Sequence, residues 1–263
     1  MNFDITPFLE DWDYRPGEIC VRKFKAKDGT ERIQLRVDLG LLQMNSEGRP
    51  DGKKPCGHES WFHHYESRLA KHQVEHDGQA DGFVLTSEDC SKLLQEAIQY
   101  HHRYICFFQL QDYTSVIRDT QRNLRVFDFV DEFAASDEMS WSLQQFRPQL
   151  LMMETRARGS LALKAEQVSE ATEVVEQGIE AIRDFYQEFS RPDLADQSGE
   201  IQSLETWLKQ LEERAKEKEA TRPLSPREKL EAALREAVGR EDYETAAKHR
   251  DSLRRLEASP ETA

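Results

Sequence analysis

Large apolar residues recur every three or four positions through the middle of the chain, in four successive runs. Side chains at that spacing share one face of an α-helix, and such faces joined by short polar turns indicate antiparallel helices. The runs are Leu93, Leu94, Ile98 and Ile105; Val116, Ile117, Leu124, Phe127 and Val130; Leu143, Leu150, Leu151 and Leu161; and Val168, Val175, Ile179 and Ile182. This periodicity predicts a mainly α chain with a helical repeat-like bundle over residues 83–190.

Polar residues mark where three of these helices should begin. Gln111-Asp112 precedes the second run, Ser136-Asp137 the third, and residues 167–169 the fourth. Each segment offers a side chain that can accept a hydrogen bond from a free amide of the first helical turn.

Two groups of residues in these helices look like divergent tetratricopeptide helices. They are Arg103-Tyr104, Asp112-Tyr113, Asp119-Thr120 and Leu124 in the first pair, and Arg156-Ala157, Leu161-Ala162 and Ala171 in the second. The two groups lie about 50 residues apart, more than the 34 of that repeat, and its signature Trp and Pro are missing. The resemblance therefore implies a TPR-like bundle without the regular repeat.

In residues 1–80, apolar residues alternate with polar ones. Residues 18–24 and 31–39 show the two-residue period of a half-buried strand, and Asp28-Gly29 between them suits a tight turn. These features predict a β-hairpin. Residues 40–44 either extend the second strand or begin a third.

A helix should follow the hairpin. Trp61, Tyr65 and Leu69 recur every four residues within residues 59–73, and we expect this face to cover the hairpin and complete a small α/β N-terminal domain. Residues 74–82 are polar and glycine-rich, which indicates a domain boundary.

A new apolar stripe begins after residues 190–193, which end the bundle. The stripe matches a coiled coil but covers only about two heptads, so residues 199–220 are predicted to be a helical connector that serves either as a spacer or as a homodimer seam. Its members are Ile201, Leu204, Leu208 and Leu211. Residues 221–226 contain two prolines, which predict a linker before a separate module.

The last module, residues 225–258, is predicted to be a two-helix hairpin. Ser225-Pro226 places a capping residue before a proline in the first helical turn; Gly239-Arg240 should break that helix, and Asp242 should cap the second. A hairpin of about 30 residues cannot bury its apolar strip alone, although two small residues, Ala246 and Ala247, let its helices approach closely. The residues expected to form this strip and bind a partner are Leu230, Leu234, Tyr243, Ala246, Ala247, Arg250, Leu253 and Leu256.

These residues resemble the UVR motif of the excision-repair proteins UvrB and UvrC. In that motif, spaced leucines precede Glu-Asp-Tyr/Phe-Glu-x-Ala-Ala and Arg-Asp-x-Ile/Leu-x-x-Leu; the counterparts are Leu230 and Leu234, residues 241–247, Arg250-Asp251, Leu253 and Leu256. The resemblance implies pairing between two such hairpins, and so a protein partner such as another UVR-containing protein. Residues 38–44 and 48–52 also look similar to bacterial proteins that carry a C-terminal UVR motif.

Charge and composition exclude several classes of protein. The net charge is −14, and residues 221–263 hold nine Lys and Arg against nine Asp and Glu, so the whole excess lies in residues 1–220. A negative body repels phosphates, and we expect no direct nucleic-acid binding by it. No apolar run reaches the roughly 20 residues of a membrane helix and no signal-peptide pattern is present, so we expect a cytoplasmic protein without a membrane partner.

Residue types that bind metals gather in one segment. Histidines one helical turn apart can be metal ligands, but Arg68 shares their stripe and would repel a cation, so we favour a solvated histidine face and no metal. The segment holds Cys56, His58, His63, His64, His72 and His76. The four cysteines of the chain form no Cys-x-x-Cys pair, which favours reduced, mostly buried thiols.

No spacing in the chain specifies a reaction. Residues 48–54 are glycine-rich and basic, but they lack the ending of a phosphate-binding loop, and a plain turn is favoured over an anion-binding nest. No nucleophile lies at a recognisable spacing from a base. We therefore expect no catalytic residue, no cofactor and no enzymatic activity.

The preferred hypothesis is a non-catalytic adaptor that docks through its C-terminal hairpin. Two alternatives keep the hairpin: an accessory factor of nucleotide excision repair that pairs with UvrB or UvrC, and an adaptor of a Clp-type protease. A third makes residues 1–80 a ligand-binding or enzyme domain that uses Arg49, Asp51 and the histidines.

Overall fold

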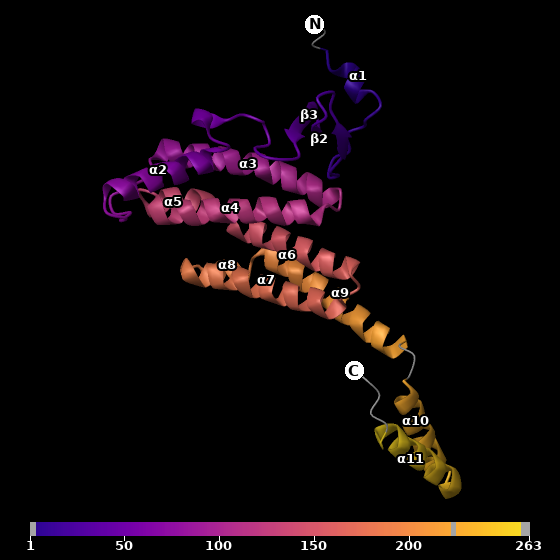
Figure 1. Cartoon of the computed structure of the whole chain (residues 1–263). Helices are drawn as coiled ribbons and strands as arrows, with labels where there is room; N and C mark the ends of the chain where they lie inside the picture. The colour runs from indigo at the N-terminus through magenta and orange to yellow at the C-terminus, as the bar shows by residue number, and fades with distance from the viewer. Residues whose placement is uncertain (1–3, 222–224, 259–263) are drawn as a thin grey trace. The chain divides into compact units, whose positions relative to one another are not determined.

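The computed structural model describes residues 4–221 and 225–258. The chain divides into two compact units, Met1–Glu212 and Glu213–Ala263. Most of the described residues are helical, as the periodicity predicts, with one small sheet near the N-terminus (Figure 1). Much of the predicted linker at 221–226 lies outside the described residues.

Three antiparallel strands form the sheet, in the order β1-β2-β3. They are β1 (Val21–Lys25), β2 (Glu31–Val37) and β3 (Gly40–Asn45). The predicted hairpin is confirmed: Lys23 pairs with Ile33, and Gly29 takes a φ of 81° in the turn, a conformation that suits glycine. Residues 40–45 form a third strand, with Met44 opposite Ile33.

Most of the first unit is built from helices. The elements are α1 (Thr6–Leu9), η1 (Pro55–Gly57), α2 (Trp61–Glu75), α3 (Ser87–Gln109), α4 (Tyr113–Phe133), α5 (Asp137–Gln144), α6 (Arg147–Lys164), α7 (Val168–Glu188), α8 (Pro192–Ala195) and α9 (Gly199–Thr221), the last of which continues into the second unit. Asp112 and Ser136 cap α4 and α5 as predicted. Gln167 precedes α7 as expected, but its side chain makes no capping hydrogen bond.

The third predicted helix is in fact two. It breaks between α5 and α6, where Pro148 occupies the first turn of the new helix. Proline has no amide hydrogen to donate, and the first helical turn is where that loss costs least.

Helix α2 packs on α3, and the expectation that its apolar face covers the hairpin is wrong. The Tyr65 hydroxyl donates to Asp89 at 2.7 Å, Lys92 lies over the Trp61 ring, and Phe62 meets Phe129 of α4 edge to face. The sheet instead contacts α3 through β2. Packing on α3 and α4 removes the apolar face of α2 from water, which favours this arrangement.

One apolar core runs from the sheet to α6. It joins Ile33 and Met44 of the sheet, Tyr65 of α2, and the helices α3 to α6. Leu85, which follows the polar segment 74–82, is also fully buried in it. Side chains on both sides of that segment therefore share one core.

A second apolar cluster joins α6, α7 and α9. The predicted connector stripe lies inside it: Ile201, Leu204 and Leu211 are buried. Gly159 of α6 makes room for α9, because a Cβ there would lie 2.6 Å from the Trp207 ring. The stripe of α9 thus packs within its own chain.

Arg103 and Asp119 form a buried ion pair between α3 and α4. The guanidinium donates to both carboxylate oxygens, at 2.7 and 2.8 Å, and each side chain is 1% exposed. The third guanidinium nitrogen, Nη1, donates to the backbone carbonyls of Asn45 and Gly48. This pair therefore holds the end of β3 against the helices.

Glu96 of α3 is the centre of a second buried ionic group. It accepts hydrogen bonds from the backbone amides of Trp61 and Phe62, at 2.8 and 3.3 Å, and so caps the start of α2. Arg49 lies 2.9 Å from it, and Arg122 of α4 also pairs with it. One carboxylate thus fastens three segments together.

Candidate partner-binding site

The second unit contains a helical hairpin, α10 (Pro226–Gly239) and α11 (Tyr243–Ala258). Ser225 and Glu228 form a capping box at the start of α10, as the Ser-Pro pair predicts. Asp242 accepts hydrogen bonds from the amide and hydroxyl of Thr245, at 3.1 and 2.7 Å. These bonds, chiefly the one from the hydroxyl, lower the pKa of Asp242, so the charged form of this cap is favoured.

The turn between the helices does not use the glycine expected to break α10. Gly239 is still helical, and Glu241 takes the left-handed conformation with φ 60°. The amide of Asp242 donates to the carbonyl of Ala237, and that of Glu241 to Val238. These two bonds define a Schellman motif, which satisfies carbonyls at the helix end.

Small side chains lie between the two helices and let them pack closely. Ala246 is buried, as expected for close helix packing, whereas Ala247 is only half-buried. The second buried alanine is Ala237, which sequence reasoning did not single out. Its position in the last turn of α10, three residues after Leu234 on the leucine-bearing face, is the signal that could have identified it.

The other predicted binding residues divide into two groups. Leu230, Leu234 and Leu253 are half-buried between the helices. Arg250 is exposed and pairs with the neighbouring Asp251. Two apolar members are open to solvent, Tyr243 at 70% and Leu256 at 44%.

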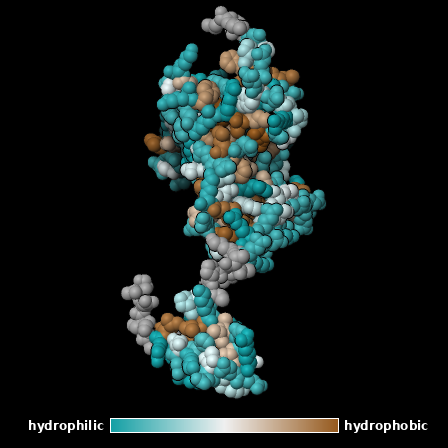
Figure 2. Space-filling view, turned by 90° about the vertical axis from the view of Figure 1, so that its right-hand side faces the viewer, coloured by the Kyte–Doolittle hydropathy of each residue, from teal (hydrophilic) through white to brown (hydrophobic). Residues whose placement is uncertain are grey.

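Val238 adds to the apolar surface of the hairpin. It is 50% exposed in the last turn of α10, close in sequence to Tyr243 in the first turn of α11. Figure 2 shows apolar groups on the hairpin surface, among mainly hydrophilic ones. The hairpin also carries exposed ion pairs such as Lys248–Glu244, at 2.9 Å, and each contributes less than about 1 kcal/mol.

Residues of the alternative N-terminal site are engaged in other contacts. Arg49 pairs with Glu96 and lies 3.4 Å from Asp51. His72 contacts the carbonyl of Asp81 through Nε2, and its ring stacks on His76 at 3.9 Å. Within residues 4–221 and 225–258, no group of three or more His, Cys, Asp or Glu side chains is arranged to hold a metal ion.

The cysteines lie in different environments. Cys90 and Cys106 are buried, Cys20 is half-buried and Cys56 is exposed. Burial raises the pKa of the Cys106 thiol to about 12, which keeps it protonated and unreactive.

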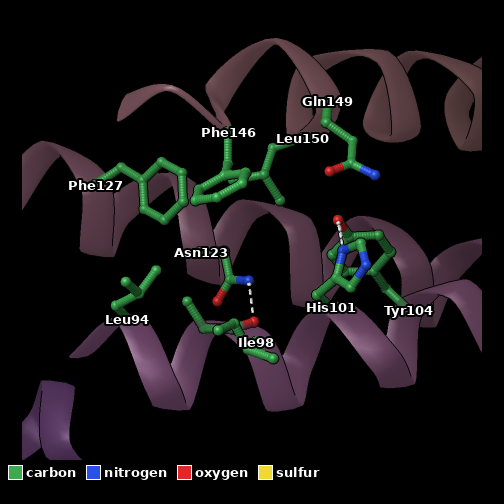
Figure 3. Close-up of a pocket in the computed structure, with 10 residues that line it drawn as sticks. Leu94, Ile98, His101, Tyr104, Asn123, Phe127, Phe146, Gln149 and Leu150 are labelled. Carbon is green, nitrogen blue, oxygen red and sulfur yellow. Dashed lines mark hydrogen bonds between the residues drawn. The ribbon is translucent and has the colours of Figure 1, made fainter. Parts of the chain in front are cut away.

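The body also contains a pocket of about 220 Å³ between α3, α4 and the α5–α6 junction (Figure 3). Apolar side chains form most of its wall, and no spacing in the sequence pointed to it. Among the described helices, none is long and apolar enough to cross a membrane.

The geometry defines a capped two-helix module with an exposed aromatic residue. Residues 226–259 match the family model of the UvrB/uvrC motif, which confirms the resemblance that the leucine, alanine and Arg-Asp spacing indicated. No curated protein and no solved structure matches the chain.

Proposed function

We propose that this protein is a non-catalytic cytoplasmic adaptor whose hairpin docks onto a helical hairpin of a partner protein. The observation that carries the proposal is the 70% exposure of Tyr243 within a UvrB/uvrC motif. An aromatic ring in solvent gains free energy when a partner covers it, and aromatic residues dominate many docking surfaces.

The packing of the hairpin supports this proposal. Two helices bury few side chains between them, and the buried ones among residues 225–256 are the small Ala237 and Ala246. A second hairpin placed against Tyr243, Val238 and Leu256 would complete a four-helix core, in which apolar faces are shared. The partner class is therefore another UVR-type hairpin.

Two cellular settings fit that partner class: nucleotide excision repair, with UvrB or UvrC as the partner, and a Clp-type protease. The UvrB/uvrC motif match favours the first as the setting to test.

Removal of the tail tests the role of the hairpin. Full-length protein and a version without residues 221–263 are used to capture partners from cells, and candidates are then purified and titrated by calorimetry. The proposal requires a direct partner that binds the full chain and not the truncated one. A partner that binds both equally would place docking on the body instead.

Tyr243→Ala should weaken that interaction by on the order of 2 kcal/mol, or about 30-fold in affinity, because a central aromatic contact is lost. The matched control is Arg254→Ala, which removes an exposed charge and should change binding by less than about 0.5 kcal/mol. Hydrogen exchange must first show that the hairpin helices of both variants are intact. Unchanged affinity of an intact Tyr243→Ala variant would contradict docking through this surface.

A further inference from the structure

The pocket in the body is mostly apolar and partly open to solvent. Its floor is formed by Ala97, Phe127 and Leu150, each 4% exposed or less. Ile98 of α3 and Phe146 at the start of α6 form part of its lining at 45% exposure each. Neither side chain belongs to the apolar core. Both instead line the open part of the pocket.

Hydrogen-bonding groups lie at one end of the pocket. The Nδ1 atom of His101 and the hydroxyl of Tyr104 are 2.7 Å apart, and the Gln149 amide faces them across the space (Figure 3). Within the part of the chain that the structure describes, neither His101 Nε2 nor the Gln149 amide has a hydrogen-bond partner. Both are therefore free to bind a ligand.

The remaining polar side chain of the lining is satisfied by the protein itself. The Asn123 amide donates to the carbonyl of Ala97 at 2.9 Å and its oxygen accepts from Arg122 at 3.0 Å. The part of the pocket beside Asn123 therefore offers a ligand only apolar contact. The polar groups of the pocket lie at the other end, near His101 and Gln149.

We propose that this pocket binds a small uncharged molecule that has an aromatic or branched aliphatic body and one hydrogen-bonding group. The volume of about 220 Å³ limits the ligand to roughly ten non-hydrogen atoms, since a 150 Å³ apolar cavity holds benzene. The apolar body lies against Phe127 and Leu150, and the polar group meets His101 and Gln149.

Charge excludes other ligand classes. No Lys, Arg, Asp or Glu side chain lines the pocket. Burial, with a smaller contribution from His102, lowers the pKa of His101 to about 4, so its ring is neutral at pH 7. A carboxylate or ammonium group would lose its hydration there without gaining a counter-ion.

The test uses 4-methylphenol and toluene as probes, which differ by one hydroxyl group. Each is titrated into full-length protein while backbone amide NMR signals are followed. We expect saturable binding of 4-methylphenol with a Kd of about 1 mM or tighter, with shifts centred on Phe127, His101 and Leu150. Toluene should bind about 5-fold more weakly, because one hydrogen bond is missing.

His101→Phe keeps a ring in the pocket wall but removes the hydrogen-bonding nitrogen. In this variant the advantage of 4-methylphenol over toluene should disappear, and this double comparison isolates the polar end from the apolar body. Gln95→Leu, on an exposed position of α3 outside the pocket, is the control and should leave both affinities unchanged.

Ile98→Trp should close the pocket from its exposed wall and abolish binding of both probes. Because Ile98 lies outside the core, the variant should fold, which its NMR spectrum verifies. Absence of saturable binding to the wild type, binding that survives Ile98→Trp, or equal affinity for the two probes in the wild type would each overturn the proposal. The last outcome is also the one expected if the pocket holds an apolar side chain of a protein segment.

Discussion

Glu96 and Asp119 carry negative charge at places where water does not reach. Each is held by two arginines, Glu96 by Arg49 and Arg122, and Asp119 by Arg103 and Arg118. Buried ion pairs of this kind are costly to break, since loss of one partner leaves an uncompensated charge. These ion pairs determine which segments of the chain pack against one another.

Asp119→Asn should lower the free energy of unfolding by on the order of 3–5 kcal/mol, because Arg103 stays buried without its counter-ion. The matched control is Glu47→Gln, an equally conservative change at an exposed carboxylate paired with Arg118, which should cost less than about 1 kcal/mol. Urea unfolding followed by circular dichroism measures both. Equal effects of the two variants would show that the burial of the Arg103 pair has no energetic consequence.

His101 should make stability depend on pH. Its pKa is about 4 in the folded chain and about 6.5 when unfolded, so the unfolded state binds more protons between these values. Stability from this group is therefore present above pH 6.5 and is lost as the pH falls toward 4. The loss should be about 3 kcal/mol at most. Urea unfolding at pH 7 and pH 4.5 should show a smaller decrease for His101→Phe than for the wild type, and equal decreases would contradict the low pKa.

For single residues, helix-capping roles could be predicted from the sequence, but contacts between residues far apart in the chain could not. Asp112, Ser136 and Ser225 act within three residues of their own position, and their chemistry follows from the next turn of helix. The bond from Arg103 to Asn45 joins residues 58 positions apart. Nothing in the spacing of either residue indicates that meeting, which depends on how the sheet lies on α3.

Among the elements, the turn between α10 and α11 places a residue with a side chain where glycine is usual. Glu241 adopts a φ of 60° at the position that follows the helix C-cap. A residue with a Cβ is strained in that conformation, and the strain is part of the free energy of the hairpin.

Glu241→Gly should stabilise the hairpin by about 0.5–1 kcal/mol, because glycine adopts the left-handed region without strain. The expected readout is slower hydrogen exchange of the amides of α10 and α11 in the full-length protein, with exchange in α3 and α4 unchanged. Faster exchange in the hairpin would show that the Glu241 side chain makes contacts worth more than the strain.

The break between α5 and α6 shows why regular spacing of apolar residues does not reveal every interruption of a helix. Gln145 and Phe146, which separate the two helices, both have backbone angles in the α region. The rotation per residue across the break is therefore close to that of a helix. As a result, Leu143 and Leu150 still point to the same side of the chain. The period stays continuous although the hydrogen-bond ladder does not.

For the whole molecule, the net charge differs between the two parts of the sequence. All of the net −14 resides in residues 1–220, while the remainder is neutral. A neutral hairpin can approach protein partners of either charge, whereas the body repels polyanions.

Residues 1–220 should not bind duplex DNA at physiological salt, because no counter-ions are released from DNA by a surface that does not neutralise phosphates. Fluorescence anisotropy of a labelled duplex at 150 mM salt should remain flat when this fragment is added. The full-length chain is the parallel sample. Tight binding by the fragment would contradict the charge argument.

The amount of helix and the small sheet followed from periodicity, but the arrangement of these elements did not. The face of α2 was expected to cover the hairpin, but the sheet contacts α3 instead, and the spacing of apolar residues does not indicate which helix packs on the sheet. The pocket could not be predicted either, because His101, Phe127 and Gln149 come from three helices and share no spacing along the chain. The C-terminal hairpin could be predicted from the sequence because its two helices are neighbours along the chain.

The cap that Glu96 provides for α2 also sets an order of events during synthesis. As the chain leaves the ribosome, residues 1–75 emerge first, yet the carboxylate that caps α2 and its partner Arg122 emerge later. Residues 1–75 therefore cannot complete their contacts before α4 is available, although domains generally fold from the N-terminal side. The sheet and α2 can form their local contacts early, but the ionic contacts that join them to α3 and α4 form only after residue 122 has been synthesised.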